Sequence, residues 1–178
     1  MEVVGFGWDF AEHCNYGAQA GGDPIVFLND DTIPQPGWLE ALCAPFSDPQ
    51  VGITGGRLTY PDGRIQHAGV YLDRPGGILT AHNVLTDEPS RDVEAVTGAC
   101  LAIRRVLWDE LAGFDTGFRN GYEDIDLCLR ARTAGWRVWY AADAHVVHLE
   151  SQSGPARWAH VNQNVTRLQE RHGDHHLV

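Results

Sequence analysis

Alternating apolar and polar positions predict a chain that switches repeatedly between helices and strands. Residues 8–20 have a helical period and stop at two glycines, and the apolar run at 24–28 predicts a short buried strand. Residues 38–46 predict another short helix. Residues 51–70 predict two strands around a Pro-Asp-Gly turn, a hairpin that we place on the flank of the sheet.

The second half of the chain continues this alternation. Residues 93–103 predict a strand, and residues 104–113 predict a helix that ends at a glycine. A helix at 121–136 and strand-like segments from 136 to 148 follow, before a final helix at about 155–171. Because no repeat, linker or shift in composition divides the chain, the pattern predicts a single α/β domain.

Two adjacent carboxylates follow the first predicted strand. Asp30 and Asp31 stand just beyond the apolar residues of strand 24–28. Their negative charges repel each other unless a positive group lies beside them. Ligands of open α/β sheets bind beyond the carboxyl ends of the strands, which is where these residues are expected. The stretch therefore predicts a cation-binding site.

Composition narrows the class of protein. The 178 residues are 43% hydrophobic, enough for one core, and the net charge of -11 argues against nucleic acid as a partner. The four cysteines include no CxxC pair, so we expect buried free thiols in a reducing compartment. No signal peptide is evident, and no apolar run approaches the roughly 20 residues of a membrane helix. We therefore expect a soluble, cytoplasmic protein, or one peripheral to the inner face of the membrane.

A second acidic group lies in the first turn of the predicted helix 121–136. It consists of Glu123, Asp124 and Asp126. Carboxylates at a helix N-terminus complement the helix dipole, and Asp126 is spaced to pair with Arg130. This purely structural interpretation and a catalytic one are both open from the local sequence.

The combination of motifs resembles a family-two nucleotide-sugar glycosyltransferase of the GT-A fold. The matching stretches occur in the order of the family and cover most of the chain: "GFGWDFAEHCNYGAQAGGDPIVFLNDDT", "TGACLAIRR", "GFDTGFRNGYEDIDLCLRARTAGW" and "HVVHLESQSG". The resemblance implies a mixed, mainly parallel sheet flanked by helices. It also implies a donor and metal portion at 1–35, an acceptor and catalytic portion at 94–155, and a C-terminal helix and tail at 156–178.

The resemblance assigns a donor and metal site. Asn29 opens the "NDD" version of the family's DxD motif, Asp30 is placed to hydrogen-bond the donor ribose, and Asp31 is the expected metal ligand. His148 is the expected second ligand of Mn²⁺ or Mg²⁺, while His145 has no matching role. Without the resemblance, a histidine bonded to backbone would be the simpler reading of His148. The tail histidines are expected to be solvated: His172, His175 and His176.

The resemblance also assigns the chemistry of transfer. Asp124 is the expected general base for the acceptor hydroxyl, and Glu123 orients the acceptor or the base. Gly98 and Ala99 would let the donor sugar approach the backbone, although ordinary strand packing explains such small residues equally well. Direct displacement predicts inversion at the sugar, because no second, nucleophilic carboxylate is evident. The substrates would be a nucleotide-diphosphate sugar and a saccharide or lipid-linked acceptor.

Two departures from the family keep a rival interpretation open. The chain opens after the family's base-binding strands, so we expect an N-terminally truncated fold whose strand 24–28 is an exposed edge, covered by a second copy in a homodimer. Cys14 stands where many relatives place an arginine near the diphosphate. The rival is a weakly active or inactive GT-A-like module with a binding or assembly role. A dinucleotide-binding enzyme is disfavoured, because Phe10 replaces the third glycine after Gly5 and Gly7.

Overall fold

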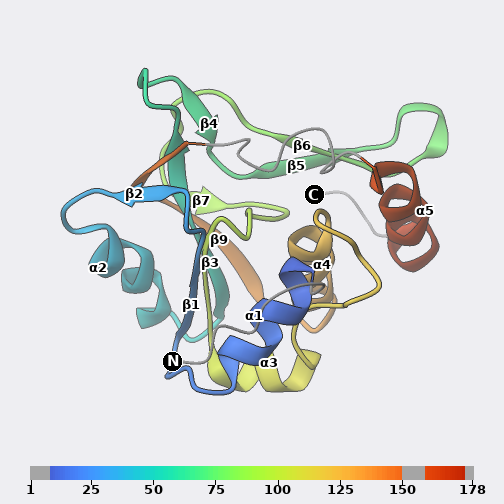
Figure 1. The fold of residues 1–178 in the computed structure, drawn as a ribbon, viewed down its shortest axis with the longest axis horizontal. Coiled ribbons are helices and arrows are strands. Elements are labelled where there is room, and N and C mark those ends of the chain that lie inside the picture. The colour runs from blue at the N-terminus through green and yellow to red at the C-terminus, as the bar shows by residue number, and fades with distance from the viewer. Residues whose placement is uncertain (1–8, 150–158, 175–178) are drawn as a thin grey trace.

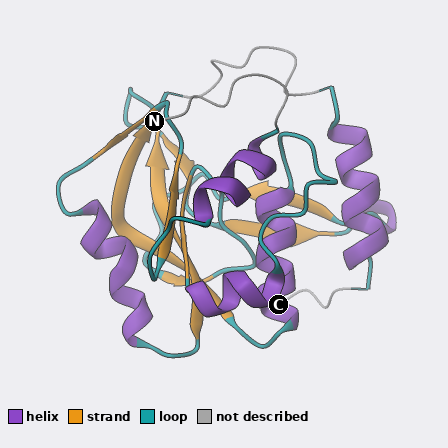
Figure 2. Ribbon diagram, turned by 60° about the horizontal axis from the view of Figure 1, so that its bottom comes forward, coloured by secondary structure: helices purple, strands orange, loops and turns teal. Residues whose placement is uncertain are grey.

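The computed structural model describes residues 9–149 and 159–174, and it places a mixed sheet between layers of helices (Figures 1 and 2). Five strands form the main sheet in the spatial order β1 (Ile25–Leu28), β8 (Cys100–Ile103), β3 (Val51–Thr59), β9 (Arg137–His148) and β2 (Thr32–Pro34). Two short strands attach to it, β4 (Ile65–His67) to β3 and β7 (Arg91–Asp92) to β9. A separate two-stranded sheet joins β5 (Val70–Asp73) to β6 (Thr80–Asn83).

Among the described strands, the parallel pair is the central one, β3 and β9. β3 and β9 run parallel, whereas β1–β8, β3–β8 and β2–β9 are antiparallel. The mixed α/β fold class is thereby confirmed. The predicted hairpin exists as β3 and β4, but its placement on the flank was wrong because β3 is the central strand. Nearly every residue of β3 is buried, as expected for a strand covered on both faces.

The helices lie close to the predicted ranges. They are α1 (Phe10–Ala18), α2 (Trp38–Cys43), α3 (Arg105–Leu111), α4 (Glu123–Thr133) and α5 (Val161–His172). The predicted helix 38–46 is an α-helix continued by a 3₁₀ turn, η1 (Ala44–Ser47), and a second such turn is η2 (Pro75–Gly77). Part of the predicted final helix, up to residue 158, falls outside the described residues.

Helices cover both faces of the sheet, with α2 on one face and α1, α3 and α4 on the other (Figures 1 and 2). The larger core includes Ile53, Leu101 and Leu129, each with no exposed surface. The smaller core centres on Leu42 of α2, whose carbonyl accepts a hydrogen bond of 2.7 Å from the Thr54 hydroxyl. The two apolar cores, one on each face, therefore hold the sheet whose strand ends carry the candidate residues.

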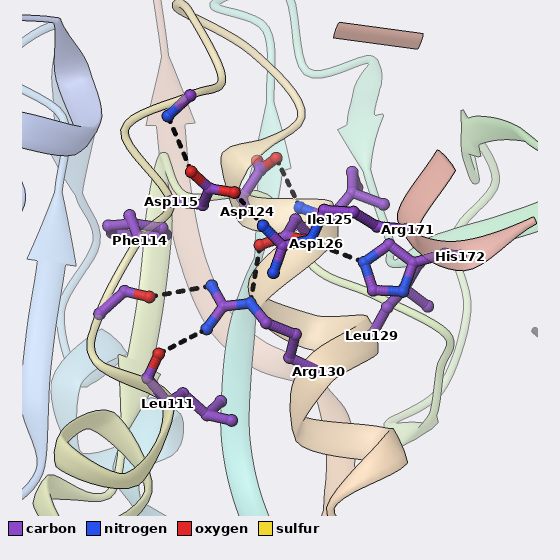
Figure 3. Close-up of polar contacts among 12 residues, drawn as sticks. Leu111, Phe114, Asp115, Asp124, Ile125, Asp126, Leu129, Arg130, Arg171 and His172 are labelled. Atoms are coloured by element: carbon purple, nitrogen blue, oxygen red, sulfur yellow. Dashed lines mark hydrogen bonds and ion pairs between the residues drawn. The ribbon is translucent and has the colours of Figure 1, made fainter. Parts of the chain in front are cut away.

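A buried carboxylate joins α4 to α5 (Figure 3). Asp126 has no exposed surface, and its oxygens lie 2.7 Å from Arg130 Nε, 2.9 Å from His172 Nε2 and 3.2 Å from Arg171 Nε. The predicted pairing of Asp126 with Arg130 is confirmed. The prediction of a solvated His172 was wrong, since only 8% of it is exposed. His175 and His176 lie outside the described residues.

Two further expectations concern the surface and the thiols. β1 is the terminal strand of the main sheet among the described residues, with Leu28 38% exposed. All four cysteines are free, as expected, but only Cys100 and Cys128 are buried; the expectation of burial was wrong for Cys14 and Cys43, which are partly exposed. Within the described part of the chain, no helix is long and apolar enough to cross a membrane.

Candidate active site

The two expected metal ligands lie side by side, although they come from opposite halves of the chain. β2 pairs antiparallel with the end of β9, so that Thr32 faces His148. The amide of Leu149 donates to the Asp31 carbonyl over 2.9 Å. This pairing places His148 Nε2 3.1 Å from Asp31 Oδ1, with both side chains largely buried. The expected juxtaposition of Asp31 and His148 is therefore present.

The imidazole of His148 has one satisfied and one unsatisfied nitrogen. Its Nδ1 lies 2.7 Å from Gln66 Oε1, and an amide oxygen can only accept a hydrogen bond. The Nε2 atom is buried, lies beside the Asp31 carboxylate and makes no hydrogen bond. Because buried polar atoms are rarely left unpaired, an orphaned imidazole nitrogen next to a carboxylate oxygen fits a divalent cation. The donor set therefore suits Mn²⁺ or Mg²⁺.

His145, which could imitate a ligand in the sequence, is engaged elsewhere. Its Nε2 lies 2.9 Å from the hydroxyl of Thr59. Burial, followed by the charge of Arg57, lowers the pKa of His145. Among the described residues, no group of three or more His, Cys, Asp or Glu side chains is arranged to hold a metal ion. Asp31 and His148 are therefore a pair of candidate metal ligands, with no third such side chain beside them in the described part of the chain.

The "NDD" turn is tied to the strand that carries the small residues. The amide of Asn29 donates to the carbonyl of Ala99 over 3.0 Å, and its carbonyl accepts from the Thr32 hydroxyl over 2.6 Å. The side chain of Asp30 is exposed. The backbone around Ala99 therefore runs beside the turn that presents Asp31.

The same backbone segment also contacts the expected base. Gly98 N–H donates to Asp124 Oδ2 and Ile125 N–H donates to Asp124 Oδ1, each over 2.8 Å. A Cβ atom on Gly98 would lie 3.3 Å from the ring of Phe10 and 3.5 Å from Asp124 Cβ. The absence of a side chain at Gly98 lets the backbone approach both groups. Burial raises the pKa of Asp124, while these hydrogen bonds act in the opposite direction.

Asp124 lines a cavity of about 230 Å³. Polar side chains from several elements share it, namely His82, Asn83, Thr97, Asn120, Tyr122 and Asn164. Polar groups that converge in this way are a feature of binding sites. A larger cavity of about 920 Å³ beside the ends of α4 and α5 is lined by Arg132, Arg137 and Arg171, all of them paired with carboxylates.

Glu123 is adjacent to the base but faces the backbone. Its Oε2 accepts the amide of Gly121 over 2.7 Å, and only 5% of the residue is exposed. Burial, followed by the charge of Asp124, raises the pKa of Glu123 to about 7. Placing a carboxyl group in a buried position is costly, and the hydrogen bond from the Gly121 amide offsets part of that cost.

A contorted segment leads into the acidic turn. Asn120, Gly121 and Tyr122 have φ values of 48°, 147° and 73°, a conformation that strains the two non-glycine residues. Asn164 of α5 holds this segment: its Nδ2 donates to the carbonyls of Arg119 and Gly121, each over 2.9 Å. The strain and its clamp lie directly before Glu123 and Asp124.

The sequence analysis missed Gln66 and Asn164. Both are polar side chains that are at least 94% buried, Gln66 with 6% and Asn164 with 2% exposure. Only a weak feature of the sequence marks these two residues. Each is an uncharged polar residue at a position where the pattern of a short strand or an amphipathic helix places a core residue. Their partners lie far away in the sequence.

Comparison with known proteins identifies the family of this chain. A family model described as "Glycosyltransferase like family 2" matches residues 1–169. The chain belongs to glycosyltransferase family 2. Among curated members, the O-antigen biosynthesis protein RfbC of Myxococcus xanthus is 34% identical over 146 residues, which are 76% of this chain and 12% of that protein.

A second curated protein and a solved structure are also similar to this chain. The N-acetylglucosaminyl-diphospho-decaprenol L-rhamnosyltransferase of Mycobacterium tuberculosis is 30% identical over 172 residues, covering 84% of this family-two chain and 56% of that enzyme. The crystal structure of GalNAc-T7 with UDP, GalNAc and Mn²⁺ superposes with a TM-score of 0.69 at 18% identity, covering 91% of this chain and 34% of that one. The family-two domain therefore has the GT-A fold, and it spans only part of the length of each of these proteins.

Proposed function

We propose that this family-two domain transfers a sugar from a nucleotide-diphosphate donor to a saccharide or lipid-linked acceptor, with inversion at the sugar carbon. The observation that carries the proposal is the backbone of residues 97–99. It contacts the turn that holds Asp31 beside His148 on one side and the partly buried carboxylate of Asp124 on the other. A site for the departing diphosphate and a base for the acceptor would thus adjoin one short segment.

Asp124 is proposed as the general base. An acceptor hydroxyl in the cavity would transfer its proton to a carboxylate oxygen of Asp124 as it attacks the sugar. Burial supports this role, because a carboxylate with a raised pKa is a stronger base at neutral pH. Glu123 would keep the base in place through the turn at Gly121.

Inversion is supported by the lining of the cavity. Among the described residues that line it, Asp124 is the only carboxylate. Retention by a covalent route needs a second carboxylate within about 5 Å of the first, acting as the nucleophile. Direct displacement by the acceptor is therefore the mechanism that this lining favours.

Asp31 and His148 would hold a divalent cation, Mn²⁺ or Mg²⁺, together with oxygens of the donor. Such a cation, when bound, neutralises the negative charge that develops on a departing diphosphate. Two protein ligands are few for a metal that prefers six, so we expect tight binding only when a nucleoside diphosphate is present. The exposed Asp30 is proposed to accept a hydrogen bond from the donor ribose, and Gly98 and Ala99 to line the path of the donor sugar.

The test of the base is a transfer assay with a panel of UDP-, TDP- and GDP-sugars and lipid-linked or oligosaccharide acceptors. Asp124→Asn should slow transfer by roughly 10²- to 10⁴-fold while donor affinity stays unchanged, since the base acts on the acceptor. Asp143→Asn, at an exposed position, is the matched control. Normal turnover in Asp124→Asn would move the base to another residue.

Donor binding without transfer by the unaltered protein would favour the alternative, a binding or assembly module with the GT-A fold. The expected homodimer and a location at the membrane face remain predictions. Light scattering and vesicle co-sedimentation check them.

A further inference from the structure

We propose that Gln66 is a positioning residue that selects the Nδ1–H tautomer of His148 and so presents the Nε2 lone pair, beside Asp31, to a divalent cation. The inference deepens the proposed function and rests on it. Gln66 itself would touch neither the metal nor the substrates. It would act only through His148.

Gln66 lies at a buried position in a short strand. It lies in β4, between β3 and the loop that precedes β8, and only 6% of it is exposed. Its neighbour His67 is 1% exposed, and the Nδ1 of His67 lies 2.9 Å from Asn83 Oδ1 while its Nε2 accepts the amide of Thr97 over 3.4 Å. Because neighbouring residues of a strand point to opposite faces, these contacts of His67 hold β4 while Gln66 faces the end of β9.

The contact with Gln66 assigns the hydrogen of a neutral His148. The amide oxygen Oε1 of Gln66 lies 2.7 Å from Nδ1, and in this orientation of the amide the oxygen can only accept, which places the hydrogen on Nδ1. In a neutral imidazole the other nitrogen, Nε2, then bears a lone pair. This atom faces Asp31 Oδ1 at 3.1 Å, and a carboxylate oxygen is also an acceptor.

Two facing acceptors need a positive group between or beside them. Either a second proton makes His148 an imidazolium or a metal cation binds both atoms. A metal-binding histidine usually donates its second N–H to an oxygen, which fixes the ring orientation and the tautomer. The Gln66 amide supplies such an oxygen.

The tautomer can be measured without any metal. Long-range ¹H–¹⁵N spectra at pH 8.5, with the His148 signals assigned by their loss in His148→Ala, distinguish the two neutral tautomers and the imidazolium. We expect Nδ1–H in the unaltered protein, retention of that tautomer in Gln66→Glu, and a shift toward Nε2–H in Gln66→Leu. An Nε2–H tautomer or an imidazolium in the unaltered protein would overturn the inference, as would an unchanged spectrum in Gln66→Leu.

Metal affinity gives a second readout. In Mn²⁺ titrations followed by electron paramagnetic resonance with UDP present, Gln66→Leu should bind Mn²⁺ roughly 10- to 100-fold more weakly, whereas Gln66→Glu should recover binding. If Gln66→Leu does not fold, as judged by circular dichroism, Gln66→Asn is tested in its place. Its shorter side chain moves the amide oxygen away from His148 Nδ1 and keeps a polar residue at the position. Gln50→Leu, at an exposed position, controls for loss of a glutamine.

A double-mutant cycle separates positioning from general damage. In His148→Ala, the further change Gln66→Leu should have no effect on Mn²⁺ affinity, since Gln66 acts only through the imidazole. Additive losses would contradict the inference. If the unaltered protein binds no Mn²⁺ with UDP, the proposed metal-dependent function fails, and the NMR experiment still decides the role of Gln66.

Discussion

Replacing Glu123 by glutamine should make the protein more stable at neutral and alkaline pH. Glu123 is 5% exposed, and burial followed by the charge of Asp124 raises its pKa from the usual 4.5 to about 7. The folded protein therefore binds a proton at Glu123 that the unfolded chain has already released. Stability must fall as the pH rises between these two values, because the ionised group is disfavoured only in the folded state.

The expected size follows from the pKa. At about 1.4 kcal/mol per pKa unit, a rise from 4.5 to about 7 corresponds to roughly 3 kcal/mol of unfolding free energy lost between pH 4.5 and pH 7. Glutamine stays neutral at every pH, and its side-chain oxygen can still accept the Gly121 amide that now lies 2.7 Å from Glu123 Oε2. The variant should exceed the unaltered protein by less than about 1 kcal/mol at pH 5 and by up to about 3 kcal/mol at pH 8.

Urea unfolding at pH 5.0 and pH 8.0 measures this difference directly. The titration of groups that do not interact with Glu123 cancels when the two proteins are compared at each pH. Glu110→Gln, on the exposed face of α3, is the matched control and should show the same pH dependence as the unaltered protein. A free-energy difference between Glu123→Gln and the unaltered protein that is equal at both pH values would refute the argument.

Three further predictions concern packing and the link between α4 and α5. Asp126→Asn should lower the unfolding free energy by roughly 3 to 5 kcal/mol in urea titrations, because it removes the charge from a fully buried ion-pair network; a loss below 1 kcal/mol would contradict that view. Asn164→Ala should lower stability by about 1 to 3 kcal/mol and slow transfer while leaving Mn²⁺ binding intact, since it frees the carbonyl at Gly121; unchanged transfer would show that the clamp does not position the base. Gly55→Ala should cost about 1 to 3 kcal/mol in thermal unfolding, because the new Cβ would lie 2.3 Å from Val96 Cβ, and an unaltered melting temperature would show that the core can relax.

Local pattern was sufficient for the helices, for β1, β3, β4, β8 and β9, and for the charged residues of the candidate site, but it missed the short strands β2, β5, β6 and β7. A strand whose apolar residues stop at Asp30 and Asp31, and a helix that starts with Glu123 and Asp124, can be recognised within a few residues. Hydrophobic periodicity sets which face of each element is buried, and the residues at the ends of elements are left to carry polar groups. The sequence alone therefore identifies these four carboxylates as candidates, but it does not say where they lie relative to one another.

Tertiary structure alone decided what each residue contacts. β3 became the central strand, and His172 became a buried partner of Asp126, because strand order and helix docking depend on the packing of the whole chain. Gln66 and Asn164 meet their partners across long stretches of sequence. No local period distinguishes a buried glutamine that orients a histidine from one that faces water, because the difference arises only when β4 is placed against the end of β9.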